Sequence, residues 1–397
     1  MSILFSQGRI GDLELKNRFI HSATYEGMAE ETGKVSDRLV RRYKTLAKGE
    51  IGLIIPGYCY VHQSGRAFKY QTGIHSDDMI QGLKNITDAV HQEGGKIVFQ
   101  IAHAGRQTKK DLIGQVPMGP SKMGRDPINF SKAVSMTEGQ ILEIIEAFGQ
   151  AARRAVEAGA DGIQLHSAHG YLINQFLSPF FNQRDDKWGG SDENRFRFMK
   201  EVVQFTKKEM PEDMPLLVKL NTNDYTPKVG ITPELAAKYA KWLGEIDIDG
   251  IEVSCGSAVF SFLNMCRGDV PVKELVGNLA WWMKPLGKLM MNSFVGKYDL
   301  EEGYNLEAAK MIKPLIGNTA LAVVGGIRTK AMMEEIIEAG HADFLSMSRP
   351  FIREPSIVKK MKEGTADAVA CESCNRCLAA AASNMQVKCY NKGFPKK

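Results

Sequence analysis

The sequence predicts an α/β fold, a (β/α)8 TIM barrel followed by a short cysteine-containing C-terminal extension. Two observations predict it: short apolar segments alternate with longer segments of helical period, and eight such pairs follow one another. The expected helices include residues 137–158, 233–243 and 329–339. The expected strands are residues 18–23, 52–55, 96–101, 162–166, 216–221, 250–254, 321–324 and 343–347.

Several of these expected strands are apolar throughout, as in Leu53-Ile54-Ile55 and Ile97-Val98-Phe99. A continuous apolar run is typical of a strand that is buried on both faces of a parallel sheet. An open doubly wound sheet with two extra strands is the alternative. No G-x-G-x-x-G sequence follows the first strand, which disfavours that alternative.

Two regions depart from the alternation. Residues 256–319 are too many for one loop and one helix, so we expect an insertion after the sixth strand. It contains Trp281, Trp282, Met283, Met290 and Met291, which either pack in the core of the insertion or form part of a lid over a pocket. The second region is the tail. We therefore expect a barrel domain over residues 1–362 and a C-terminal extension over 363–397.

Composition excludes several classes of function. The chain has 397 residues, 24% of them charged, with a net charge of +5 and no basic block, so no nucleic-acid partner is expected. No segment approaches the roughly 20 apolar residues of a membrane span, and the N-terminus lacks the features of a signal peptide. These observations predict a cytoplasmic protein with a small-molecule substrate and no membrane partner, and they leave a homo-oligomer open.

The end of the fourth expected strand carries the most informative motif, the segment 166–171 with the sequence His-Ser-Ala-His-Gly-Tyr. Residues at the C-terminal ends of barrel strands face the active site. Neutral imidazoles at His166 and His169 could bind a carbonyl or phenolate oxygen, and the Tyr171 hydroxyl could donate a proton. A zinc pair or two structural histidines is the alternative, although no third zinc ligand lies beside them.

Several longer blocks resemble the signature of the Old Yellow Enzyme (NADH:flavin oxidoreductase) family, including the FMN barrel domains of 2,4-dienoyl-CoA reductase and trimethylamine dehydrogenase. They appear in the family's order and cover nearly all of the chain. The blocks are Leu15-Lys16-Asn17-Arg18, Gln100-Ile101-Ala102-His103-Ala104-Gly105-Arg106, residues 166–172, Gln175-Phe176-Leu177-Ser178-Pro179, Asn182-Gln183-Arg184, residues 188–195 and Ser346-Met347-Ser348-Arg349-Pro350-Phe351.

The resemblance implies FMN at the C-terminal mouth of the barrel, with NAD(P)H as the reductant. The backbone of residues 22–24 would lie along the isoalloxazine ring, and Gln100 would bind its pyrimidine part. Glycines and an arginine after the seventh and eighth strands would bind the phosphate. The residues expected at the cofactor are Ser22, Ala23, Thr24, Gln100, Lys219, Gly325, Gly326, Ser348 and Arg349, with Tyr58 as a further candidate for the flavin pocket.

By the same resemblance, His166 and His169 would bind the activating oxygen of the substrate and Tyr171 would be the proton donor. Two positions depart from the family's pattern. Lys219 stands where the family usually has an arginine near the flavin, which keeps the positive charge but loses the planar fork of donors. Tyr25 stands where some relatives have Cys or Thr, and we expect it to contact substrate.

The C-terminal extension carries Cys371, Cys374, Cys377 and Cys389, four of the seven cysteines of the chain. This spacing resembles the iron–sulfur site that follows the barrel in trimethylamine dehydrogenase and 2,4-dienoyl-CoA reductase. A [4Fe–4S] cluster, structural zinc, and cysteines that only pack the tail remain alternatives. The chain ends eight residues after Cys389, so we expect no second nucleotide-binding domain. The other cysteines, Cys59, Cys255 and Cys266, are expected in the core.

These observations together predict an FMN-dependent ene-reductase, which transfers hydride from NAD(P)H to the activated C=C bond of an α,β-unsaturated carbonyl compound. Such substrates include enones, enoates, flavonoids and steroids. One alternative is an amine dehydrogenase or demethylase that passes electrons through the cysteine tail. A non-catalytic flavin subunit for electron transfer is an alternative from another class.

Overall fold

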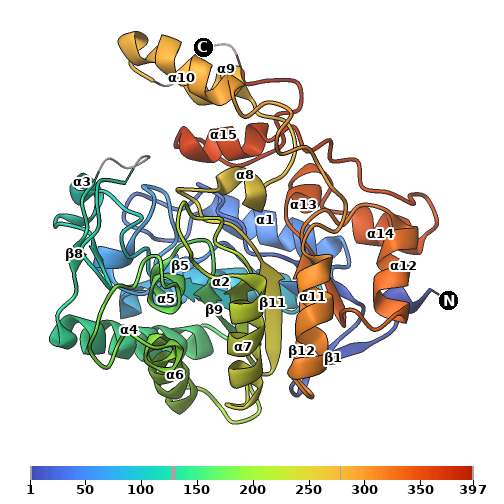
Figure 1. Cartoon of the computed structure of the whole chain (residues 1–397). Coiled ribbons are helices and arrows are strands. Elements are labelled where there is room, and N and C mark those ends of the chain that lie inside the picture. The colour runs from blue at the N-terminus through green and yellow to red at the C-terminus, as the bar shows by residue number, and fades with distance from the viewer. Residues whose placement is uncertain (1, 127–130, 278, 396–397) are drawn as a thin grey trace.

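The computed structural model describes residues 2–126, 131–277 and 279–395, and Figure 1 shows a barrel surrounded by helices. Its main sheet has nine strands in the order β4-β3-β13-β12-β11-β10-β9-β6-β5, and every neighbouring pair is parallel. The strands are β3 (Phe19–His21), β4 (Leu53–Ile54), β5 (Cys59–Tyr60), β6 (Phe99–Ala102), β9 (Ile163–Ser167), β10 (Leu216–Asn221), β11 (Gly250–Ser254), β12 (Ala320–Val324) and β13 (Phe344–Met347).

Hydrogen bonds between β4 and the segment before β6 close this sheet into a barrel. The Ile54 N–H donates to the Lys96 carbonyl at 2.9 Å, and the Val98 N–H donates to the Ile54 carbonyl at 3.0 Å. All eight expected strands are present, and β10 and β11 have the predicted bounds. The barrel is therefore confirmed, and the open doubly wound sheet is excluded.

The helices on the outside of the barrel begin where the sequence places capping residues. Thr137 and Gln140 form a reciprocal capping box at the start of α4, and Thr232 and Thr329 cap α7 and α12. These caps explain why the predicted and observed starts agree to within one residue. The outer helices are α1 (Asp37–Lys48), α2 (Ile80–His91), α4 (Glu138–Glu157), α6 (Asp192–Lys208), α7 (Pro233–Gly244), α11 (Leu306–Ile312), α12 (Lys330–Glu338) and α14 (Ile357–Lys362).

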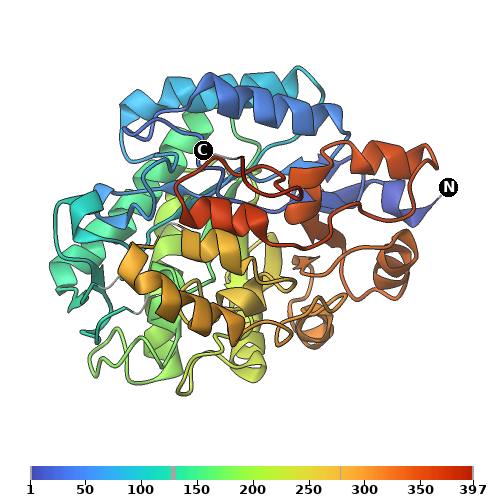
Figure 2. The same cartoon turned by 90° about the horizontal axis from the view of Figure 1, so that it is seen from above.

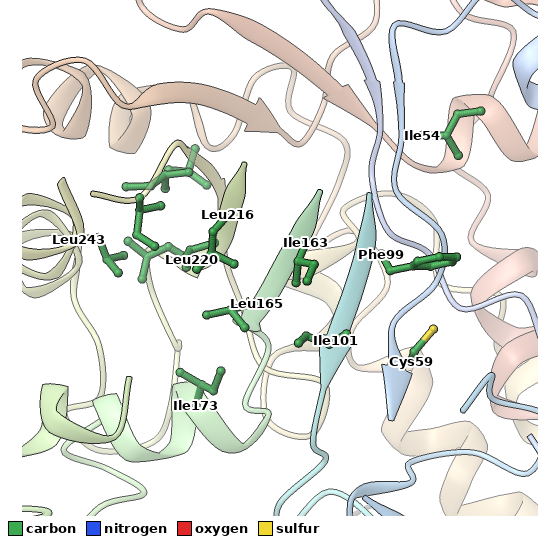
Figure 3. Packing of buried hydrophobic residues seen from close by; sticks show 14 of the residues in the cluster. Ile54, Cys59, Phe99, Ile101, Ile163, Leu165, Ile173, Leu216, Leu220 and Leu243 are labelled. Atoms are coloured by element: carbon green, nitrogen blue, oxygen red, sulfur yellow. The ribbon is translucent and has the colours of Figure 1, made fainter. Parts of the chain in front are cut away.

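Both faces of the barrel strands are buried, as the uninterrupted apolar runs predict. Ile54 and Phe99 point outward into the core between strands and helices (Figure 3), whereas Leu53 and Val98 belong to a smaller cluster inside the barrel. Successive side chains on a strand point to opposite sides, so each apolar pair serves both cores. The hairpin of β1 (Gly8–Ile10) and β2 (Leu13–Leu15) packs against this inner cluster.

The insertion after β11 crosses the mouth of the barrel. It comprises α8 (Phe262–Met265), α9 (Val272–Gly277), the short helix η4 (Trp281–Met283) and α10 (Lys284–Asn292). Trp281 and Trp282 are 83% and 65% exposed, so the expectation that they pack in a core is wrong. Met290 and Met291 line the cavity beneath the insertion, which agrees with the alternative of a lid.

The C-terminal segment returns over the same mouth through α13 (Arg349–Arg353) and α15 (Arg376–Ala382). Seen from above, α15 lies beside α9 across the centre of the molecule (Figure 2), and the two helices are in contact. The Val387 N–H donates to the Glu26 carbonyl at 2.7 Å, which fastens the segment to the loop after β3. Within the described residues, no helix is long and apolar enough to cross a membrane.

Candidate active site

A cavity of about 1120 Å³ opens at the C-terminal ends of the barrel strands and extends under the insertion. It brings together residues from strand ends around the barrel, including those of β3, β9, β10, β11, β12 and β13, and from the tail. His166 and Gln100 are buried and do not line the cavity. The predicted site residues that line it are Ser22, Ala23, Thr24, Tyr25, Tyr58, His169, Tyr171, Lys219, Gly325, Gly326, Ser348 and Arg349.

The turn after β9 places two histidines and a tyrosine side by side. His169 and Gly170 have positive φ angles of 61° and 76°, which reverse the chain before Tyr171 caps α5 (Leu172–Leu177). The ring centroid of His166 lies 5.2 Å from that of His169 and 4.8 Å from that of Tyr171. The structure thus assembles the three residues that the sequence motif predicts.

Both histidines are neutral at physiological pH. Burial, and then the positive charge of Lys219, lowers the pKa of His166 well below its usual range. Burial lowers the pKa of His169 in the same way, with His166 and Lys219 as further causes. The His166 Nδ1 is buried and has no hydrogen-bond partner among the described residues, whereas the His169 Nε2 lies 2.8 Å from the Ser254 hydroxyl.

The hydroxyl groups of Tyr58 and Tyr171 are hydrogen-bonded at 2.7 Å. Burial raises the pKa of Tyr171 to about 12, and burial followed by the neighbouring Tyr171 raises the pKa of Tyr58 well above its usual range. Both phenols therefore stay protonated at neutral pH. Sequence reasoning predicted Tyr58 at the flavin but not its contact with Tyr171, because the two residues come from different strands.

A chain of buried polar side chains runs across the floor of the site. The Gln100 Nε2 donates to the Gln164 Oε1 at 2.6 Å, and the Gln164 Nε2 donates to the Glu252 Oε2 at 3.0 Å. The Lys219 Nζ lies 3.3 Å from the Glu252 Oε1 and donates to the Ser22 Oγ at 2.7 Å. Neither Gln164 nor Glu252 was predicted as a site residue from the sequence. The only signal was a polar residue between two apolar ones within a strand, Gln164 between Ile163 and Leu165 and Glu252 between Ile251 and Val253.

Glu252 balances the charge of Lys219 within this chain. Burial alone would raise the pKa of Glu252, but Lys219 and hydrogen bonds from Ser22, Ser346 and Gln164 lower it below its usual value. The carboxylate is therefore ionised, and the ion pair is almost fully buried. Removal of either partner alone would leave the other charge buried and unpaired, which destabilises the fold.

The ends of β12 and β13 form a cradle of backbone and cationic groups. Gly325 and Gly326 have φ angles of 123° and 69°, and a Cβ at Gly326 would lie 2.4 Å from the Glu301 carbonyl oxygen. The Ser348 and Thr24 hydroxyls are 2.7 Å apart. The Arg349 Nη1 donates to the Arg267 carbonyl at 2.8 Å and to Asn375 at 2.6 Å, so this arginine also joins the cradle to the tail.

These groups fit an FMN. The cavity has cationic side chains at Lys219 and Arg349 and a glycine cradle where side chains would clash. Glycine-rich backbone and arginine suit a phosphate. A cation beside the floor of the cavity suits a group that gains negative charge on reduction.

Tyr25 lines the cavity and precedes Glu26, whose carbonyl accepts a hydrogen bond from the tail at Val387. Its ring stacks on Phe68 with centroids 4.5 Å apart, and burial followed by the charge of Glu26 raises the pKa of its hydroxyl. The hydroxyl is buried and has no hydrogen-bond partner among the described residues. Tyr25 can therefore offer a hydrogen bond to a molecule in the cavity.

The four tail cysteines line one small cavity of about 20 Å³ together with Arg349 and Arg353. Cys377 and Arg349 line both this cavity and the large one. Burial raises the pKa of the Cys377 thiol to about 12, so a metal would have to displace its proton. Among the described residues, no group of three or more potential ligands is positioned to hold a metal ion. A [4Fe–4S] cluster and a structural zinc ion at these cysteines therefore both stay predictions.

The remaining cysteines behave largely as expected. Cys59 and Cys255 are buried, whereas Cys266 is only half-buried and lines the large cavity. No disulfide is present among the described residues, since all seven cysteines are free.

The glycine cradle leads to a testable expectation. Gly326→Ala is expected to lower stability by more than ~1 kcal/mol and to weaken FMN binding, because its backbone is left-handed and its Cβ meets Glu301 and Gly303. Gly340→Ala is the matched control, since Gly340 has a φ of 66° but nothing within 4 Å of its Cβ position. Thermal unfolding and flavin titration measure both effects. Equal stability and equal flavin affinity of the two variants would contradict the close approach of the chain to Gly326.

Comparison with known proteins identifies relatives along nearly the whole chain. The sequence model of the NADH:flavin oxidoreductase / NADH oxidase family matches residues 3–268. The NADH oxidase of Thermoanaerobacter brockii is 34% identical over 393 residues, which are 97% of this chain and 55% of that protein. The NADPH dehydrogenase of Bacillus subtilis (strain 168) is 34% identical over 353 residues, which are 89% of this chain and 92% of that protein.

Solved structures agree with the fold. A complex of 2-naphthoyl-CoA reductase with 2-naphthoyl-CoA superposes with a TM-score of 0.85 at 27% identity and covers 98% of this chain and 56% of that one. An Old Yellow Enzyme homologue from Zymomonas mobilis superposes with a TM-score of 0.74 at 24% identity, over 92% and 94% of the two chains, and shows the shared barrel. The chain spans about half the length of the NADH oxidase and of the naphthoyl-CoA reductase. It belongs to the FMN-dependent NADH:flavin oxidoreductase / NADH oxidase family.

Proposed function

We propose that the chain is an FMN-dependent ene-reductase that reduces the activated C=C bond of an α,β-unsaturated carbonyl compound with NAD(P)H. The barrel over residues 1–362 would carry the reaction, and residues 363–397 would form the cysteine extension. One observation carries the proposal. His169 and the protonated Tyr171 line a cavity that also contains Lys219, and the neutral His166 ring packs directly against both of them.

Residues in and directly behind the cavity walls would hold FMN. The backbone at Ser22, Ala23 and Thr24 lines one wall, and Lys219 lies within hydrogen-bond distance of Ser22. Gln100, Tyr58, Gly325, Gly326, Ser348 and Arg349 complete the proposed set. FMN, when bound, supplies the hydride chemistry that links NAD(P)H to the substrate.

The chain's own residues polarise the substrate and complete the reaction with a proton. His166 and His169 are uncharged donors, so their hydrogen bonds to a carbonyl oxygen strengthen as negative charge develops there. The Tyr171 phenol gives its proton to the α-carbon and recovers one through its 2.7 Å hydrogen bond to Tyr58. Tyr25 offers a further donor to the substrate. These groups do not titrate near neutrality, so alkene reduction should vary little with pH there.

The test separates the two halves of the reaction. NADH or NADPH, added anaerobically to the purified holoenzyme, should bleach the flavin absorbance, and 2-cyclohexen-1-one should restore it in the same cuvette. An amine dehydrogenase would instead be bleached by trimethylamine or histamine. A flavin that is reduced but reoxidised slowly by every enone would contradict the proposal and favour an electron-transfer subunit.

The cysteine extension has its own expected result. Anaerobically purified protein should contain iron and acid-labile sulfide in equal amounts, with a broad visible shoulder beside the flavin bands. Cys374→Ser should remove the shoulder and leave the flavin bands, whereas Cys59→Ser, a substitution in the barrel core, should leave both. Flavin bands alone, with no iron or zinc, would mean that the four thiols only pack the tail.

A further inference from the structure

The outer side of the insertion is an exposed apolar surface. We call it the lid face, and it consists of Trp281, Trp282, Leu286, Leu289 and Val295. These side chains are between 56% and 83% exposed, and they are five of the thirteen large apolar side chains that the described residues expose. Apart from Met290, which lines the cavity, the others lie elsewhere in ones and twos, such as Met311 with Leu315. An exposed apolar cluster of this kind indicates an interaction surface.

The other side of the same segment explains why these residues face outward. Gly287 and Met291 are buried, and both line the large cavity. The 3.6-residue period of α10 therefore directs Leu286 and Leu289 away from the barrel. Figure 1 shows α9 and α10 at the outer edge of the molecule, beyond α15. The lid face is therefore accessible without any rearrangement of the fold.

Within residues 275–298, which carry the lid face, all charged side chains are positive. Lys284, Lys288 and Lys297 are exposed and form no ion pair within the described part of the chain. No Asp or Glu occurs between residues 275 and 298. Of the flanking acids, Glu274 is paired with Arg376 at 2.9 Å and Glu301 is paired with Arg267, whereas Asp299 and Glu302 form no ion pair within the described residues. Residues 275–298 thus combine large apolar side chains with lysines that no acid within this segment balances.

From this combination we propose that the lid face binds the surface of an anionic phospholipid bilayer. Trp281, Trp282 and Leu286 would enter the headgroup region, where indole rings are favoured, and the lysines would meet the lipid phosphates. A second copy of the chain fits less well, because a symmetric contact would place lysines against lysines. The proposal departs from the expectation of no membrane partner, and it is independent of the ene-reductase assignment.

Cosedimentation and tryptophan fluorescence test the proposal on the full-length holoenzyme. The probes are vesicles of phosphatidylcholine alone and of phosphatidylcholine with phosphatidylglycerol. The chain has four tryptophans, of which Trp188 is buried, so entry of Trp281 and Trp282 into lipid should shift the emission to shorter wavelength. We expect binding to the anionic vesicles at least tenfold tighter than to the neutral ones, and its loss in high salt.

Variants locate the contact. Lys284→Glu with Lys288→Glu should weaken anionic binding more than tenfold, and Trp281→Ser with Trp282→Ser should weaken it and abolish the emission shift. Leu142→Ser and Leu315→Ser, at exposed positions away from the insertion, should bind as the parent does. Thermal unfolding verifies that each variant is folded. Equal binding to both vesicles, no binding, or a dimer that the tryptophan variant dissociates would each overturn the proposal.

Discussion

Tyr171→Phe is expected to slow reduction of an enone by ~10²–10⁴-fold while leaving reduction of the flavin by NAD(P)H nearly unchanged. The substitution removes the buried phenol that would protonate the α-carbon, but it keeps the ring that packs 4.8 Å from His166. Stopped-flow absorbance measures the two half-reactions separately. Because NAD(P)H needs no proton from this site to give its hydride, only the second half-reaction should respond.

Tyr58→Phe is the matched control for this experiment. It removes the hydroxyl that lies 2.7 Å from Tyr171 but leaves the proposed donor in place. A smaller loss, confined again to the enone half-reaction, is expected if Tyr58 only returns a proton to Tyr171. An equal loss of both half-reactions in the Tyr171 variant would show a structural role for the phenol and would contradict its assignment.

Lys219→Met is expected to destabilise the protein by ~3–5 kcal/mol and to reduce its flavin content, because it leaves the Glu252 carboxylate buried without its cation. Denaturant unfolding of the flavin-free protein measures the stability change without any contribution from cofactor binding. Lys219→Arg restores the charge and should recover much of the loss. The double variant Lys219→Met with Glu252→Gln should also recover stability but not flavin binding.

The effect of Lys219→Met should depend on pH in a defined direction. The folded-state pKa of Glu252 lies below its unfolded value, so the ion pair contributes stability above the unfolded pKa of about 4.3, and this contribution is lost as the pH falls through the folded pKa. The difference in unfolding free energy between parent and variant should therefore be largest near neutral pH and narrow in acid. A difference that is constant with pH would contradict an ionised Glu252.

The sequence by itself determined the barrel and most of the cofactor cavity. Strands buried on both faces and helices with capping residues are local patterns, so β10 and α7 could be predicted closely from their own residues. The motif at residues 166–171 could be predicted as a site because its members are neighbours in the chain. In each of these cases, the informative side chains lie within a few residues of one another.

Only the tertiary structure decided which distant side chains meet. The Tyr58–Tyr171 hydrogen bond joins two strands, and Glu252 acquires its role from Lys219 on the neighbouring strand. The sequence also could not decide where Trp281 and Trp282 lie, because large aromatic side chains suit a core as well as a surface. Their exposure follows from the packing of α10 over the barrel mouth. Hydrophobicity along the chain records how apolar a segment is, and only packing decides which of its faces meets water.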